Sequence, residues 1–115
     1  MKRRLENYRS ARRELDEMRA RMRRAELQAA HSVYPRDRER AADAAALYEA
    51  MADTLSEELR ELELAIERLP EERVRRAVRL RYIDGHSRAR TALEMDVSER
   101  TVVNLIAEAM RTLGG

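Results

Sequence analysis

The feature that most constrains this chain is an apolar repeat in its middle third. Between residues 41 and 69, apolar or aromatic side chains recur alternately four and three positions apart without a gap. They are Ala41, Ala45, Tyr48, Ala52, Leu55, Leu59, Leu62, Ile66 and Leu69. This heptad spacing is typical of helices that pack lengthwise on one another. It predicts a helix from about Pro35 to Leu69, roughly 50 Å long at 1.5 Å per residue, and this helix needs a partner.

The preceding segment supplies the predicted partner. Residues 2–32 have a thinner apolar stripe with Tyr8, Leu15, Met22 and Ala29 at every seventh position. Pro35 marks the break between the two helices, because the residue before a proline is disfavoured in helical geometry. The short connection favours an antiparallel hairpin. We therefore expect a coiled-coil arm whose seam includes Tyr48, Leu55, Leu59, Leu62 and Ile66.

Two helices alone bury little apolar surface, so the arm needs a further partner. We expect a second copy of the chain, giving a homodimer. The alternative is an intramolecular hairpin that is completed by the third helix of the chain.

Charge changes sign along the chain although the formal net charge is only +2. Residues 1–40 carry 13 basic and 7 acidic groups, residues 41–69 carry 2 and 8, and residues 70–115 carry 9 and 7. The basic first block and the acidic second block favour two helices lying side by side, although each exposed pair contributes only about 0.2–1 kcal/mol. The alternative for the basic first helix is a phosphate-binding surface.

The last third of the chain has the spacing of a helix-turn-helix. Between Leu80 and Leu113, the positions for core contacts, helix crossing and turn are occupied in the expected order. These residues are Thr91, Ala92, Met95, Asp96, Val97, Val102 and Leu105. Ser87 and Ser98 precede the two helices and can cap them. Asp96 falls where the turn needs a positive φ, which Asp adopts at some cost.

A third helix is expected from Glu71 to Tyr82, opened by Leu69-Pro70. The apolar side chains of this helix would pack against the two helices of the helix-turn-helix. Its arginines are candidates for a phosphate-binding surface: Arg73, Arg75, Arg76, Arg79 and Arg81.

From Leu69 onward the chain resembles a known family. Leu69-Pro70-Glu71, Leu80-Arg81-Tyr82, the run from Val97 to Val102, and Ala109-Met110-Arg111 are its marks. They resemble region 4 of bacterial sigma factors, and most closely the small phage regulators of the ArpU and RinA type. The resemblance covers roughly the last 45 residues. It implies a recognition helix that contacts the −35 promoter element through positions 99, 100, 101, 103 and 104, where Arg100 and Asn104 keep the family character.

These observations together predict an all-α protein with a helical hairpin arm at 1–69 and a three-helix helix-turn-helix domain at 70–115. The resemblance implies a phage-type DNA-binding transcriptional regulator that acts on promoter DNA, RNA polymerase or both, in the cytoplasm of a bacterial host cell. The expected partners are double-stranded DNA and RNA polymerase or another host protein. We expect Arg100, Thr101 and Asn104 to contact base edges. Ser98, Arg88, Arg90 and Arg111 are expected to contact phosphates.

Enzymatic and metal chemistry is not expected. The chain has no cysteine, and its two histidines, His31 and His86, have no partner at ligand spacing. No glycine-rich phosphate loop or nucleophile motif is present, so we expect no catalytic residue, no metal and no cofactor. Charges interrupt every long apolar stretch, so no membrane span is expected.

Two alternatives belong to other functional classes. One is a phage protein that binds and inhibits a host nucleic-acid complex, either a defence system or polymerase. It is supported by the acidic second helix and by Glu99 and Val103 in the recognition helix. The other is a small terminase-like DNA-packaging adaptor, which would form a ring of many subunits.

Overall fold

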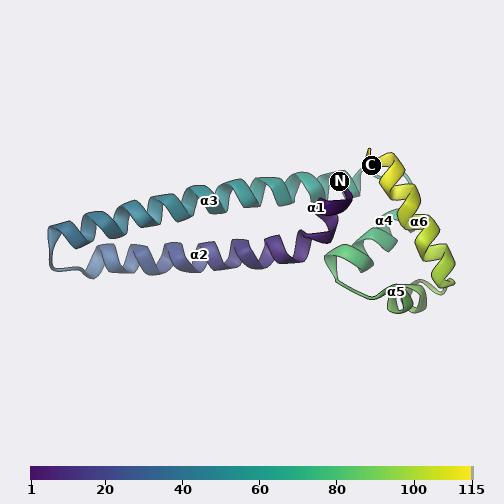
Figure 1. The fold of residues 1–115 in the computed structure, drawn as a ribbon, viewed down its shortest axis with the longest axis horizontal. Coiled ribbons are helices and arrows are strands. Elements are labelled where there is room, and N and C mark those ends of the chain that lie inside the picture. The colour runs from purple at the N-terminus through teal and green to yellow at the C-terminus, as the bar shows by residue number, and fades with distance from the viewer. Residues whose placement is uncertain (115) are drawn as a thin grey trace. The chain divides into compact units, whose positions relative to one another are not determined.

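The computed structural model describes residues 1–114, and these residues contain helices and no strand. Its elements are α1 (Lys2–Glu6), α2 (Tyr8–His31), α3 (Pro35–Glu67), α4 (Glu72–Val78), η1 (Arg79–Ile83), α5 (Arg88–Met95) and α6 (Glu99–Thr112) (Figure 1). The predicted all-α class is confirmed, with two long helices followed by a short helical region. The chain divides into two compact units, one of residues 10–59 and one of residues 1–9 with the chain from residue 60 onward.

The unit of residues 10–59 is an antiparallel helical hairpin. Most of α2 and α3 lie side by side in it, joined by the turn at residues 32–34 (Figure 1). Pro35 begins α3, where a missing N–H costs nothing. Leu15 is fully buried, and Met18, Ala25, Ala41, Ala52 and Leu59 are also buried. Tyr48 and Leu55 of the predicted seam are only half-buried.

The other unit joins the N-terminal residues to the C-terminal helices. Leu5 and Tyr8 are buried in it, as are the seam residues Leu62 and Ile66. The Tyr8 hydroxyl donates a hydrogen bond to Glu63 Oε1. Arg4 Nη2 lies 3.7 Å from Glu61 Oε2. Residues of the predicted 1–69 arm therefore occur in both compact units.

Two predicted helices are interrupted. The helix expected at residues 2–32 is divided at Asn7, between α1 and α2, where φ is −90° and ψ is −2°. The helix expected at residues 71–82 becomes a π-helix, η1, at Arg79. Its wider turn is visible in the bond from the Asp84 N–H to the Arg79 carbonyl, at 2.9 Å.

Candidate nucleic-acid interface

The turn between α5 and α6 is the local structure that sets the direction of α6. Asp96 has φ 55° and ψ 49°, the left-handed conformation expected at this position. Its backbone N–H and that of Val97 bond the carbonyls of Leu93 and Ala92, at 3.2 and 3.0 Å. These bonds satisfy the last carbonyls of α5, so the chain reverses without leaving them unpaired.

A small apolar core supports α6. Val102 and Ala109 of this helix are fully buried, and so are Ala77 and Val78 of α4. Both α4 and α5 pack against α6. Thr91 is the buried polar residue of α5, and its hydroxyl donates to the Ser87 carbonyl at 2.9 Å. The hydroxyl is therefore satisfied, and only the methyl group of Thr91 needs an apolar environment.

The opposite face of α6 is open. Arg100, Asn104, Ala107 and Arg111 are exposed, and Val103 retains 43% of its accessible surface. Their spacing of three and four residues places them along one side of the helix. Arg100 forms no hydrogen bond or ion pair with any residue of the described chain. This face therefore offers two guanidinium groups, of which that of Arg100 is unpaired, together with one amide and two apolar side chains.

Two of the predicted site residues hold the start of α6. Ser98 Oγ accepts the Thr101 N–H at 3.1 Å and lies 3.0 Å from Thr101 Oγ1. The Ser98 hydroxyl is thus the N-terminal cap of the helix. The amides of Glu99 and Arg100 precede the capped one and are the donors left at the helix start.

The predicted phosphate contacts of α5 lie in its first turn. Arg88 and Arg90 are both exposed, and Ser87 caps the helix by accepting the Arg90 N–H at 3.0 Å. The Arg90 side chain also lies 3.7 Å from Glu94 Oε1, one turn along. An exposed pair of this kind contributes little to stability, so Arg90 can exchange it for a phosphate.

The arginines of α4 and η1 mostly have structural partners. Arg75 donates to the Leu69 carbonyl at 2.6 Å, Arg76 to the Glu94 carbonyl at 3.0 Å, and Arg81 to the His86 carbonyl at 2.7 Å. Each of these carbonyls lies just after a helix or in its last turn, where backbone acceptors lack helical partners. Arg79 lies 3.7 Å from Glu67. Sequence reasoning could not assign these pairings, because the acceptors belong to other elements.

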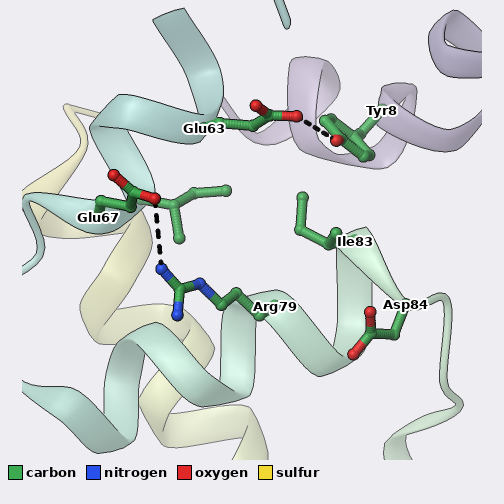
Figure 2. Close-up of a pocket in the computed structure, with 7 residues that line it drawn as sticks. Tyr8, Glu63, Glu67, Arg79, Ile83 and Asp84 are labelled. Atoms are coloured by element: carbon green, nitrogen blue, oxygen red, sulfur yellow. Dashed lines mark hydrogen bonds and ion pairs between the residues drawn. The ribbon is translucent and has the colours of Figure 1, made fainter. Parts of the chain in front are cut away.

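A pocket of about 190 Å³ lies beside η1 (Figure 2). It is lined by Tyr8, Glu63, Ile66, Glu67, Arg79, Ile83 and Asp84. Figure 2 shows the Glu67–Arg79 ion pair and the Tyr8–Glu63 hydrogen bond at its wall. The single arginine is outnumbered by three carboxylates, so the pocket disfavours phosphate and is separate from the exposed face of α6.

Two titratable groups near α4 and α6 are shifted. A hydrogen bond with Glu71, reinforced by the negative charge of that residue, raises the pKa of Glu108, and Arg111 opposes the shift. Burial raises the pKa of the Tyr82 hydroxyl, against the influence of Arg81. Tyr82 lies in η1, away from α6, whereas Glu108 lies on α6 between Asn104 and Arg111 and borders the exposed face of this helix.

No group of three or more His, Asp or Glu residues within residues 1–114 could hold a metal ion. No helix in the same range is long and apolar enough to cross a bilayer.

Comparison with known proteins agrees with the helix-turn-helix geometry. Residues 59–113 match the family model described as "Sigma-70, region 4". No curated protein and no solved structure matched the chain. The matched range contains α4, η1, α5, α6 and the last residues of α3. Over this range, slightly less than half of its length, the chain is therefore similar to sigma-70 region 4.

Proposed function

We propose that the protein is a DNA-binding transcriptional regulator, of the small phage type represented by ArpU and RinA, that acts at promoters in the cytoplasm of a bacterial host. The observation that carries the proposal is the exposed face of α6, with Arg100 unpaired and Asn104 one turn away. This face lies on a capped helix with a buried core behind it, inside the range that matches sigma-70 region 4.

In the proposed complex, α6 enters the major groove of the double-stranded DNA. A guanidinium can donate two parallel bonds to guanine O6 and N7, and a carboxamide can pair with adenine N6 and N7. Arg100 and Asn104 are the groups that would form such contacts. Val103 and Ala107 would contact thymine methyl groups. The Thr101 hydroxyl lies 3.0 Å from the capping hydroxyl of Ser98 and can form a further hydrogen bond. It would use this bond to contact a base edge.

The phosphate contacts would come from the start of α5 and from both ends of α6. Arg88 and Arg90 lie in the first turn of α5, and Arg111 lies in the last turn of α6. The free amides at the start of α6 add the positive end of the helix dipole, with Ser98 beside them. Such contacts orient a protein on DNA without selecting a sequence.

Fluorescence anisotropy with promoter fragments and random duplexes at two salt concentrations tests this proposal. Arg100→Ala should cost about 1–3 kcal/mol on the preferred sequence and reduce discrimination between sequences. Arg88→Ala should weaken binding to all duplexes about equally and reduce the salt dependence. Arg38→Ala, at an exposed position of the hairpin, is the control. If the unmodified protein shows no salt-dependent binding to any duplex, DNA is not its ligand.

A contact with RNA polymerase or another host protein is a second candidate function. It is favoured by Leu93 of α5, which retains 82% of its accessible surface next to the exposed Ala89 and Arg90. In such a complex the partner would cover Leu93 together with Ala89, one turn earlier on α5. Leu93→Gln, which adds no charge beside Arg90, should then abolish capture of one dominant protein from host lysate while leaving DNA affinity unchanged. Loss of DNA affinity alone would argue against this second candidate.

A further inference from the structure

Helix α3 carries a second heptad stripe beside the one that faces α2. Its members are Arg40, Ala44, Leu47, Met51, Thr54 and Glu58, spaced four and three residues apart. Each precedes by one residue a member of the seam that runs from Ala41 to Leu59. Consecutive residues of an α-helix are about 100° apart, so the two stripes lie on neighbouring faces of α3. A helix with two such stripes can pack against two partners at once.

The apolar centre of the second stripe is exposed. Leu47 and Met51 at its centre retain 60% and 40% of their accessible surface, whereas Ala52 and Leu59 of the α2-facing seam retain 5% and 4%. Tyr48 and Leu55, on the side of the seam toward this stripe, are only half-buried. The apolar surface of α3 is therefore wider than α2 covers.

The order of residues in the second stripe is self-complementary. If two copies of α3 pack antiparallel around a twofold axis midway between positions 47 and 51, Leu47 faces the second copy's Met51. Ala44 then faces the second copy's Thr54, and Arg40 faces the second copy's Glu58. Opposite charges thus meet at both ends of an apolar centre, as isologous packing requires. The Thr54 hydroxyl already donates to the Ala50 carbonyl at 3.1 Å, so its methyl group can be buried without an unpaired donor.

We propose that this stripe is the dimer interface of the protein and that its occupant is the same stripe of a second copy, packed antiparallel. A different protein would not need a stripe that is complementary to its own reverse order, whereas an antiparallel second copy requires one. The pattern also fixes the register, because a shift by one heptad would separate Arg40 from Glu58 and bring apolar residues opposite charges. This inference does not depend on DNA binding.

Sedimentation equilibrium of the full chain, without DNA, tests the interface. We expect the unmodified chain to form a species of twice its 13.5 kDa mass. The double variant Leu47→Lys, Met51→Lys should raise the dimer dissociation constant on the order of a hundredfold or more, because it places four charges in the apolar centre. Leu27→Lys is the matched control, since Leu27 is 59% exposed on α2 and lies outside the stripe. Circular dichroism of each variant reports whether the hairpin is still folded.

Charge reversal and cross-linking test the register. Arg40→Glu and Glu58→Arg should each weaken the dimer, and the double reversal should restore it. The chain has no cysteine, so chains with Leu47→Cys mixed with chains with Met51→Cys should form a mixed disulfide faster than either variant alone. A folded monomer at every concentration would overturn the proposal, and so would a dimer that is weakened by Leu27→Lys rather than by the stripe variants.

Discussion

The guanidinium of Arg9 occupies the space where a side chain on Gly85 would lie. A Cβ atom built on Gly85 would be 1.9 Å from Arg9 Nη1 and 2.6 Å from Arg9 Cζ. Gly85 also has φ +72°, in the left-handed region that favours glycine. The N-terminal segment and the turn that follows η1 are thereby packed together in one compact unit.

Gly85→Ala should destabilise the protein by about 1–2 kcal/mol, mainly through the left-handed backbone conformation. The steric part can be relieved, because the contact is made by the far end of a flexible side chain. In a double-mutant cycle with Arg9→Ala, we therefore expect the cost of Gly85→Ala to fall but to remain above zero. Urea unfolding measures both effects. An additive cycle would show that Arg9 does not lie against this turn.

Asp96 should be replaceable by glycine with a gain in stability. Its φ of 55° costs free energy for any residue that has a Cβ atom. Asp96→Gly should raise the free energy of unfolding by about 0.5–1 kcal/mol, and Asp96→Ala should lower it. Asp84→Gly is the matched control, because Asp84 has φ −82° and gains nothing from glycine. A thermal melt of the three variants checks the order.

Two substitutions of Ser98 distinguish its contribution to stability from its proposed contribution to DNA binding. Ser98→Ala should cost about 1 kcal/mol of stability, because the Thr101 N–H loses its acceptor. Ser98→Asp should keep the cap but place a negative charge at the proposed phosphate contact, so the fold should persist while DNA affinity falls. Ser87→Ala gives a comparable loss at the start of α5. Equal DNA affinity of Ser98→Asp and the unmodified protein would place the phosphate elsewhere.

Replacing an arginine of α4 by alanine should lower stability only where its side chain has a hydrogen-bond partner. Arg75→Ala removes a hydrogen bond to the Leu69 carbonyl and should destabilise the protein by about 1 kcal/mol. Arg73→Ala, at an exposed position of the same helix, should change stability by less than about 0.5 kcal/mol. Chemical unfolding measures the difference. Equal losses at the two positions would mean that the Arg75 bond contributes nothing.

The Glu71–Glu108 pair predicts a pH dependence of stability. Because the folded-state pKa of Glu108 is raised above its ordinary value of 4.5, protonation of this group favours the folded state. Its contribution is complete below pH 4.5 and is lost as the pH rises through the folded-state pKa. Glu108→Gln should therefore melt at a higher temperature than the unmodified protein at pH 7, with the difference vanishing below pH 4.5. Arg111→Gln should have the opposite effect at pH 7, because Arg111 lowers this pKa.

The local signals of this chain predict α3, the starts of α5 and α6 and the turn between them, but not the break at Asn7 or the π-helix η1. The four-three repeat from Ala41 to Leu69 predicts α3 because burying one stripe of a helix requires that spacing. Ser87 and Ser98 predict the starts of α5 and α6 because a hydroxyl at that position satisfies a free amide of the same helix. The left-handed conformation at position 96 follows from the turn that joins the two helices. Each of these interactions joins residues only a few positions apart.

Only the tertiary structure decided which charged and apolar groups have partners. The sequence marks Arg75, Arg76 and Arg81 as basic, but their acceptors lie in loops and helix ends that the fold brings to them. Likewise, both stripes of α3 can be found in the sequence, yet only the fold shows that α2 covers one and leaves Leu47 and Met51 exposed. The physical reason is that helical periodicity depends on neighbouring residues, whereas burial and pairing depend on segments far apart in the chain.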